Sequence, residues 1–237
     1  MSVNILTIDG TQVAGGDGQT ILAVAAENDI RIPTLCHLDG LSDVGACRLC
    51  LVEVAGSPKP RLACMTPADQ GMDVTTTSDL LAGWRATIIE MLFVERNHVC
   101  SVCVANRHCE LQDLAVEMGV THFDLPAVSP QLEVDLTHRL FGVDHNRCVL
   151  CTRCVRVCDE IEGAHTWDVA GRGLAARVVT DLGTPWGDSD TCTSCGKCVQ
   201  VCPTGALFEK GRAVAEGSKV QRPFLPYLRA HIEDTPR

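Results

Sequence analysis

Alternating apolar and polar positions near the N-terminus predict a β-rich start to the chain. The pattern from Val3 to Ile8 has the two-residue period of a half-buried strand, and the Asp-Gly pair at 9–10 is a strong hairpin signal. Thr20 is placed to cap a short apolar helix. Further along, Leu51–Val54 again has the composition of a strand. We therefore expect a strand, a hairpin, a helix and further strands in this part.

A helical region is predicted next. Ser78 is placed to cap a long amphipathic helix, in which apolar residues recur at steps of three and four. We expect this helix to end near Asn97 and its apolar stripe to pack as core against the neighbouring domain. The stripe consists of Leu80, Leu81, Trp84, Ile88, Met91 and Leu92. The residues from Glu110 to Met118 predict a second helix.

The second half of the chain has weaker periodicity. Residues 119–140 contain prolines and scattered acidic residues, which favours a linker with little regular structure. A strand is predicted from Phe141 to Val143, and a β-rich stretch inside the insert 159–191 favours an added hairpin. The proline-containing tail, residues 211–237, is equally consistent with a docking strap and with a loose terminus.

Composition narrows the classes of function. The chain has 237 residues, of which fifteen are cysteines and only 4% are aromatic, and its formal charge is −10. A negative chain is a poor partner for nucleic acid, and no apolar run approaches the ~20 residues of a membrane span. An odd number of cysteines without a signal segment disfavours a secreted disulfide framework, so we expect a cytoplasmic protein. Metal–ligand bonds would then replace part of the packing that aromatic side chains usually supply.

Eight of the cysteines form two runs of the same design, C-x2-C-x2-C-x3-C. A cubane [4Fe–4S] cluster needs four thiolates, and three closely spaced cysteines on a looping backbone can supply three of them. The fourth cysteine of each run lies on the following helix and points away, so it ligates the other cluster, as in two-cluster bacterial ferredoxins. The predicted sets are Cys148, Cys151, Cys154 and Cys202 for one cluster, and Cys158, Cys192, Cys195 and Cys198 for the other. Zinc sites are the alternative, since C-x2-C also binds zinc.

Four further cysteines lie in the β-rich part, with the spacing C-x10-C-x2-C-x13-C. We predict that they hold a [2Fe–2S] cluster. Its ligands would be Cys36, Cys47, Cys50 and Cys64. Gly40 and Gly45 would let the backbone wrap closely around the metal. The alternative is a zinc site at the central C-x2-C pair, with the two outer cysteines merely buried.

The three remaining cysteines, Cys100, Cys103 and Cys109, supply one ligand too few for a cubane cluster. His98 and His108 are the nearest candidates for the fourth ligand. His98 ranks first, because His108 is crowded against Cys109. A lone histidine is usually structural, but three thiols that lack a partner favour a ligand role. An imidazole in place of a thiolate should raise the reduction potential.

Four basic residues lie inside or beside the two repeated cysteine runs. They are Arg147, Arg153, Arg156 and Lys197. Reduced clusters are anionic, so nearby cations would favour the reduced state. For each of these four residues considered alone, an ordinary solvated charge on the surface is an equally good interpretation.

Two segments resemble known redox families. The segment from Gly45 to Glu53, G-A-C-R-L-C-L-V-E, resembles the [2Fe–2S] domain of the large iron–sulfur subunit of respiratory complex I and of related hydrogenases. Cys-Glu-Leu-Gln-Asp at 109–113 resembles the His/Cys3 domain of complex I and of [FeFe] hydrogenases. Those families usually place three residues between the histidine and the first cysteine, whereas only Val99 intervenes here. Over its whole length, including residues 98–106, the chain resembles the small diaphorase subunit (the HoxU type) of bidirectional NAD-reducing [NiFe] hydrogenases.

The resemblance implies an α+β fold built from three cluster-binding domains. We expect a β-grasp [2Fe–2S] ferredoxin domain at 1–77, a helical His/Cys3 [4Fe–4S] domain at 78–118, a linker at 119–140, a bacterial two-cluster [4Fe–4S] ferredoxin-like domain at 141–210, and a tail at 211–237. One [2Fe–2S] and three [4Fe–4S] clusters would use all fifteen cysteines.

The expected function is the relay of single electrons, without a catalytic residue in this chain. No dinucleotide fingerprint or flavin motif is present in the sequence, so partners must carry out the chemistry. The resemblance implies a flavin- and NAD-binding diaphorase subunit on one side and the small and large [NiFe] hydrogenase subunits on the other, together converting H2 and NAD+ to NADH and H+. The alternatives are the iron–sulfur subunit of an NAD-dependent formate dehydrogenase or of a complex I-like NADH dehydrogenase module. A zinc-stapled interaction scaffold is a third class.

Overall fold

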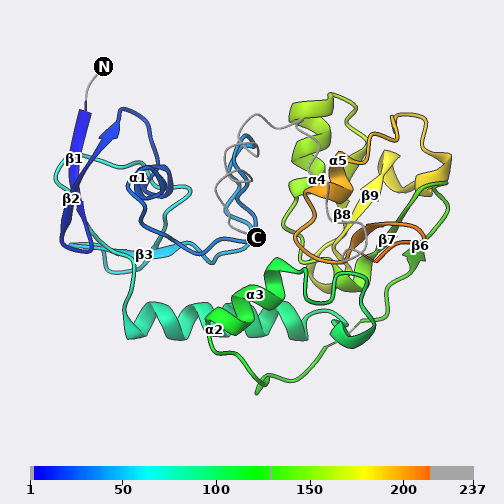
Figure 1. The fold of residues 1–237 in the computed structure, drawn as a ribbon, viewed down its shortest axis with the longest axis horizontal. Coiled ribbons are helices and arrows are strands. Elements are labelled where there is room, and N and C mark those ends of the chain that lie inside the picture. The colour runs from blue at the N-terminus through cyan, green and yellow to red at the C-terminus, as the bar shows by residue number, and fades with distance from the viewer. Residues whose placement is uncertain (1–2, 129, 214–237) are drawn as a thin grey trace.

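The chain folds into a β-rich part, a pair of helices and a second, mixed part (Figure 1). This computed structural model describes residues 3–128 and 130–213. The mixture of helices with largely antiparallel sheets confirms the predicted α+β class. Most of the predicted tail, residues 214–237, lies outside the described residues. Among the residues described, no helix is long and apolar enough to cross a membrane.

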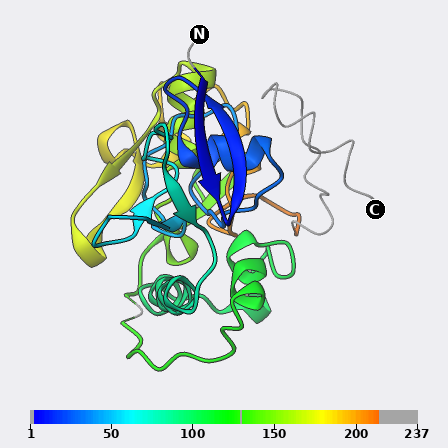
Figure 2. The same cartoon turned by 90° about the vertical axis from the view of Figure 1, so that its left-hand side faces the viewer.

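The β-rich part is a five-stranded sheet with a helix packed beside it. Its strands are β1 (Val3–Ile8), β2 (Thr11–Gly16), β3 (Leu51–Val54), β4 (Arg61–Leu62) and β5 (Asp73–Thr75), in the order β2-β1-β5-β3-β4. Strands β1 and β5 run parallel, and the other neighbours are antiparallel. Figure 2 looks onto the β1–β2 hairpin, with α1 (Ile21–Glu27) behind it.

Local sequence signals account for this part of the fold. Asp9 and Gly10 both have a positive φ, 49° and 79°, as a type I′ hairpin turn requires. The Thr20 hydroxyl accepts a hydrogen bond from the backbone N–H of Ala23 and so caps α1. The predicted hairpin, the capped helix and the strand at Leu51–Val54 are confirmed.

Two helices, α2 (Asp79–Val94) and α3 (Glu110–Glu117), lie along one side of the molecule (Figure 1). The Ser78 hydroxyl accepts a hydrogen bond from the N–H of Leu81, which confirms the predicted cap. A short 3-10 turn, η1 (Cys100–Val102), lies between the helices. Helix α2 ends at Val94, slightly before the predicted end near Asn97.

The predicted core face of α2 was wrong for three of its residues. Leu80, Trp84 and Met91 are 47%, 43% and 50% exposed. Apolar side chains lie on more than one side of α2. The spacing of apolar residues along the helix therefore does not show which side is buried. Strand β3 and helix α3 pack against the side that carries Leu81 and Arg85, and this side is the buried one.

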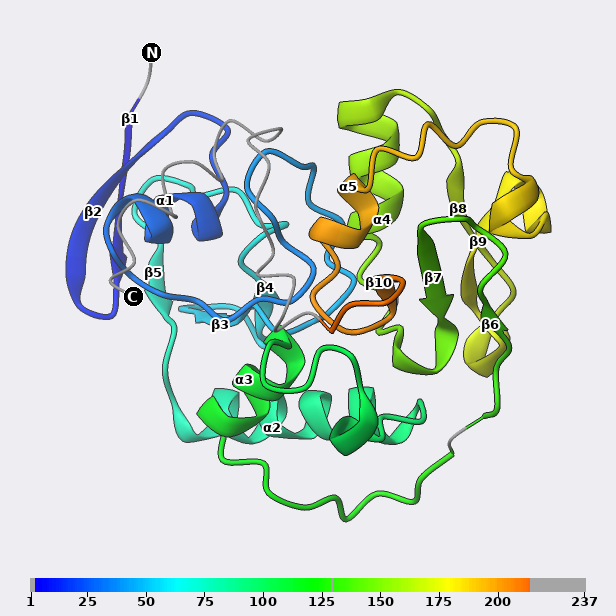
Figure 3. The same cartoon turned by 45° about the vertical axis from the view of Figure 1, so that its right-hand side comes forward.

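The second mixed part has two small sheets and two short helices. Strands β6 (Val134–Asp135), β7 (Phe141–Asp144) and β10 (Leu207–Glu209) form one sheet in the order β10-β7-β6. Strands β8 (Trp167–Ala170) and β9 (Arg177–Thr180) form the added hairpin predicted for the insert. Figure 3 turns this part forward, with β6 and β7 beside the hairpin. The short strand β6 lies inside the stretch predicted as a linker and was not predicted.

Short helical turns fill the remainder of this part, and three of its eight cysteines, Cys154, Cys158 and Cys198, lie in them. The α-helical turns are α4 (Arg153–Arg156) and α5 (Lys197–Gln200), and a π-helical turn, η3 (Val157–Glu162), continues α4. The 3-10 turns are η2 (His145–Arg147), η4 (Gly173–Ala175), η5 (Asp181–Gly183) and η6 (Trp186–Asp188). The two parts of the molecule and the helix pair also share core: one apolar cluster includes Cys36, Ile89, Leu111 and Cys151. The domain boundaries at 77, 118, 140 and 210 stay predictions.

The cap of α2 gives a first test. Ser78→Ala removes the hydroxyl that accepts from Leu81 N–H and donates to the carboxylate of Glu53, which joins the helix to β3. We expect the free energy of unfolding to fall by about 1 kcal/mol, measured as a lower thermal midpoint under anaerobic conditions. The control is Thr87→Ala on the same helix, because the Thr87 hydroxyl only donates back to the Gly83 carbonyl. Equal losses in the two variants would contradict a capping role for Ser78.

Candidate metal centres

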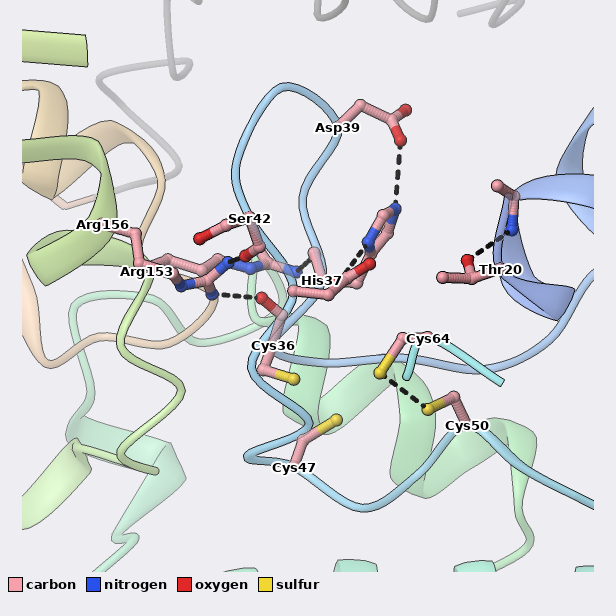
Figure 4. Close-up of polar contacts among 12 residues, drawn as sticks. Thr20, Cys36, His37, Asp39, Ser42, Cys47, Cys50, Cys64, Arg153 and Arg156 are labelled. Carbon is pink, nitrogen blue, oxygen red and sulfur yellow. Dashed lines mark hydrogen bonds and ion pairs between the residues drawn. The ribbon is translucent and has the colours of Figure 1, made fainter. Parts of the chain in front are cut away.

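The four thiols of the β-rich part lie together between the sheet and the second mixed part. Figure 4 shows the sulfurs of Cys36, Cys47, Cys50 and Cys64 pointing toward one another in two pairs. All four residues are buried. The Sγ atoms of Cys50 and Cys64 are 3.3 Å apart, and the backbone N–H of Leu35 donates to Cys47 Sγ at 3.3 Å.

These thiols are electrostatically coupled in pairs. The hydrogen bond between Cys36 and Cys47 lowers the pKa of Cys36 to about 6, and the hydrogen bond between Cys50 and Cys64 lowers the pKa of Cys50 to about 7. The same two hydrogen bonds raise the pKa of Cys47 and of Cys64. In each pair one thiol therefore ionises more easily than the other, and a bound metal would replace the remaining proton.

The loop around these thiols needs glycine at position 45. Gly45 has a φ of +61°, which glycine adopts without strain. A Cβ there would also lie 3.1 Å from the side chains of Leu62 and Met65. The loop therefore packs closely against Leu62 and Met65 because this position carries no side chain.

The second set of predicted ligands lines a single cavity. His98, Cys100, Cys103 and Cys109 surround it, together with Phe93, Ala105, Leu111, Gln112, Arg147, Thr204 and Gly205. The Nε2 atom of His98 is buried without a hydrogen-bond partner in the described structure. Burial lowers the pKa of His98 to about 4, partly opposed by a hydrogen bond to the backbone of Leu92. The ring is therefore neutral, and its free nitrogen is a good metal ligand. His108 is exposed and is not among the residues around this cavity.

The turn before β10 closes this cavity with its backbone. A Cβ at Gly205 would lie only 2.5 Å from Cys103 Sγ and 3.2 Å from the Ala105 Cβ. No larger residue fits at this position without moving the thiol. This close approach fits a site in which backbone and sulfur pack around a bound group.

The two cysteine runs have the same local geometry. Leu150 and Thr152 in the first run have φ values of 52° and 58°, and Ser194 and Gly196 in the second have 56° and 74°. Each left-handed pair turns the backbone around the first two cysteines of its run, and the third lies in α4 or α5. The repeat of spacing seen in the sequence is thus also a repeat of backbone conformation.

The fourth cysteine of each run lies with the other run. Cys148, Cys151, Cys154 and Cys202 line one cavity, and Cys158, Cys192, Cys195 and Cys198 line another. The fourth cysteine follows the α-helical turn of its own run by two residues, since Cys158 comes after the end of α4 at Arg156 and Cys202 after the end of α5 at Gln200. This grouping agrees with the arrangement predicted from the spacing.

Burial disfavours free thiolates in these cavities. It raises the pKa of Cys148 to about 11 and of Cys151 to about 12, and it also raises the pKa of Cys154 and of Cys198. Thiolates become stable there only when a positive ion replaces the protons. In the described part of the chain, no three His, Cys, Asp or Glu side chains have the close spacing that a single metal ion requires.

Several functional features had no clear signal in the sequence. The indole N–H of the buried Trp186 donates to Cys192 Sγ at 3.3 Å, although Trp186 lies in an insert without a recognisable motif. For Arg153 and Arg156 the sequence allowed two interpretations, a charge that tunes a cluster or a solvated surface charge. Both residues are buried: Arg153 is 4% exposed and Arg156 is 5% exposed. The surface alternative was therefore wrong for both.

The other two basic residues beside the runs are partly buried and paired. Lys197 forms an ion pair with Glu162, and Arg147 pairs with Asp144 and donates to the Asn97 carbonyl. Arg147 directly precedes the first run at Cys148, whereas Lys197 lies inside the second run, where it opens α5.

Three known domain families match successive parts of the chain. The 2Fe-2S iron-sulfur cluster binding domain matches residues 3–79. The NADH-ubiquinone oxidoreductase-G iron-sulfur binding region matches residues 85–123, and the ferredoxin-like domain of NADH-quinone oxidoreductase subunit 3 matches residues 139–208. These matches confirm that a [2Fe–2S]-type domain and [4Fe–4S]-type domains are present.

Curated relatives fall into two groups by length. The NADPH-Fe(3+) oxidoreductase subunit alpha of Geobacter sulfurreducens is 40% identical over 205 residues, which is 86% of this chain but 24% of that protein. The chain thus spans about a quarter of the length of this relative. The NAD-reducing hydrogenase HoxS subunit gamma of Cupriavidus necator is 32% identical over 211 residues, or 89% of this chain and 88% of that subunit.

A solved structure agrees with the second group. A chain in the crystal structure of an NAD+-reducing [NiFe]-hydrogenase in the H2-reduced state has a TM-score of 0.83 and 34% identity to this protein, with 89% of this chain and 88% of that chain covered. The resemblance predicted from the sequence is confirmed. Because a relative of similar length is matched along nearly all of both chains, this protein belongs to the family of the gamma subunit of NAD-reducing hydrogenase HoxS.

Proposed function

We propose that this chain is the electron-transfer subunit of a cytoplasmic NAD-reducing hydrogenase. It would relay single electrons between a flavin- and NAD-binding diaphorase subunit and the small and large [NiFe] hydrogenase subunits, which together convert H2 and NAD+ to NADH and H+. The observation that carries the proposal is the presence of four separate sulfur-lined sites in one chain. Similarity to the HoxS gamma subunit along nearly its full length supports the choice of complex.

Each site would hold one iron–sulfur cluster. The [2Fe–2S] ligands would be Cys36, Cys47, Cys50 and Cys64. The three [4Fe–4S] sets would be His98 with Cys100, Cys103 and Cys109; Cys148, Cys151 and Cys154 with Cys202; and Cys192, Cys195 and Cys198 with Cys158. Bound clusters of these types accept and release one electron at a time.

The chain itself would hold the sites close together and keep water out. Ligand residues of three sites, Cys36, Cys109 and Cys151, belong to one apolar cluster, and Cys158, Cys198 and Cys202 belong to another. Backbone and indole N–H groups would donate to the ligand sulfurs and stabilise their negative charge.

A complex I-like or ferric-reducing module is the second candidate. The higher identity to the alpha subunit of NADPH-Fe(3+) oxidoreductase favours it. A formate dehydrogenase subunit would need the same relay. These candidates share all four sites and differ only in the partners, so co-purification from the native host followed by a nickel assay distinguishes them. Nickel in the complex supports the hydrogenase.

The cofactor proposal predicts the iron content. Anaerobically purified full-length chain should be brown and contain about fourteen iron atoms, the stoichiometry of one [2Fe–2S] and three [4Fe–4S] clusters. The measurement is an iron and zinc assay on the same sample. About eight irons would mean that two of the cubane sites alone are filled, and stoichiometric zinc in colourless protein would instead support the scaffold alternative.

If the fourth cysteine of each run ligates the cluster of the other run, substitution of that cysteine should damage the other run's cluster. Cys158→Ser should perturb the paramagnetic signal of the cluster held by Cys192, Cys195 and Cys198, and should spare the one held by its sequence neighbours. Cys202→Ser is the matched variant and should do the reverse. Electron paramagnetic resonance of the reduced proteins makes the comparison. Damage confined to the variant's own run would contradict the exchange.

The assignment of His98 as a ligand predicts how the reduction potential of its cluster changes when the histidine is replaced. In His98→Cys the cluster should be retained, but a fourth thiolate adds negative charge, so its reduction potential should fall. His108→Ala is the control and should leave the potential unchanged, because His108 is exposed. Potentials are measured by redox titration with paramagnetic resonance. If His108→Ala shifts the potential and His98→Cys does not, the assignment is wrong.

A further inference from the structure

One side chain joins the backbones of two different metal centres. Arg156, on α4, reaches into the cysteine loop of the β-rich part (Figure 4). Its Nη2 donates to the carbonyl of Cys36 at 2.5 Å and to the carbonyl of Cys151 at 3.1 Å. Its Nη1 donates to the carbonyl of Ser42. A single nitrogen thus links a residue of the [2Fe–2S] set with a residue of a [4Fe–4S] set.

The charge on Arg156 is buried without a carboxylate partner. The side chain is 5% exposed and its Nε has no hydrogen-bond partner. In the described part of the chain it forms no ion pair, and its hydrogen bonds go only to carbonyl oxygens. A buried cation of this kind is costly unless negative charge lies nearby.

The neighbouring Arg153 provides a contrast. Its guanidinium also crosses to the cysteine loop, where Nη2 donates to the carbonyl of His37 at 2.8 Å. It is, however, paired with both carboxylate oxygens of Glu110, at 2.7 and 2.8 Å. Its charge is therefore neutralised locally, whereas the charge of Arg156 is not.

The missing counter-charge can come from the metal centres themselves. Arg156 donates directly to the backbone of one residue in each set, Cys36 and Cys151, so its charge lies beside both groups of thiols. The thiolates and the reduced forms of iron–sulfur clusters are anionic. The two centres beside Arg156 would together supply the full negative charge that neutral carbonyl oxygens cannot.

We propose that Arg156 is a positioning residue that couples the [2Fe–2S] centre to the centre of Cys148, Cys151, Cys154 and Cys202. This rests on the proposed function, because both centres must hold clusters. Its charge stabilises the reduced state of both centres, and its hydrogen bonds form the contact through which one electron passes between them. No bond breaks and no proton moves in this step: one centre is oxidised and the other is reduced by the same electron.

Three variants separate charge, contact and general packing. Arg156→Met removes both the charge and the hydrogen bonds. Arg156→Lys keeps the charge but has no planar pair of donors to bridge the carbonyls. The control is the double variant Arg153→Met with Glu110→Gln, which removes an equivalent contact to the cysteine loop without changing the net charge.

The full-length chain is purified anaerobically, and the iron content is measured first. The potentials of both centres are then obtained by redox titration with paramagnetic resonance. The rate of transfer between them is followed by rapid freezing after reduction. In Arg156→Met the reduction equilibrium of both centres should become at least about tenfold less favourable, or about 59 mV for one electron, and transfer should slow.

The other variants complete the test. Arg156→Lys should keep both potentials near those of the wild type while transfer still slows, and the double variant should change neither. Unchanged potentials in Arg156→Met with full iron content would overturn the inference, as would equal shifts in the control. If Arg156→Met does not assemble, wild-type transfer in Arg156→Lys overturns it. A wild-type chain without both clusters would instead refute the proposed function.

Discussion

The constraint on which the structure depends is the convergence of sulfur atoms from distant parts of the chain. Each candidate centre gathers side chains across a span of sequence, as Cys36 with Cys64 and Cys148 with Cys202 show. Burial raises the pKa of the Cys148 and Cys151 thiols to about 11 and 12, so they take on charge only when a metal displaces their protons. Only 4% of the residues are aromatic, so metal–thiolate bonds would add stability that core packing does not supply, and folding would then be linked to metal binding.

The parts of the molecule are joined by polar contacts inside an apolar setting. The loop that carries Cys36 receives hydrogen bonds from two arginines of α4, and an exposed ion pair of Arg31 with Glu117 adds a further connection at the edge. The same parts also share an apolar cluster that includes Cys36, Cys109 and Cys151. This combination holds separate centres in fixed relation, which is what a relay of single electrons needs.

Much of this architecture could be predicted from local signals. The turn at Asp9, the caps at Thr20 and Ser78, and the spacing of the cysteine runs each depend on neighbours in sequence, so the residues themselves carry the information. The spacing also predicted how the cysteines of the two runs group around two cavities, because the fourth cysteine of each run comes after a helical turn and lies away from the first three. The α+β class and the similarity to the hydrogenase family were confirmed on the same basis.

Features that depend on tertiary packing could not be predicted in this way. The buried side of α2 is decided by β3 and α3, and nothing within the helix distinguishes Leu81 from Leu80. The burial of Arg153 and Arg156 depends on carbonyls more than a hundred residues earlier in the chain. The sequence ranked His98 above His108 only because His108 is crowded against Cys109, and the unpaired ring nitrogen beside the cavity is evidence that needed the tertiary structure.

The central claim is that every one of the four sulfur-lined sites holds iron and that ligands are exchanged between the two cysteine runs. X-ray diffraction from anaerobic crystals, recorded on both sides of the iron absorption edge, tests it most directly. The account predicts four separate iron peaks, with Cys202 bonded to the centre of Cys148 and Cys158 bonded to the centre of Cys192. Zinc at any of these positions, or a cluster held by the four cysteines of a single run, would contradict it.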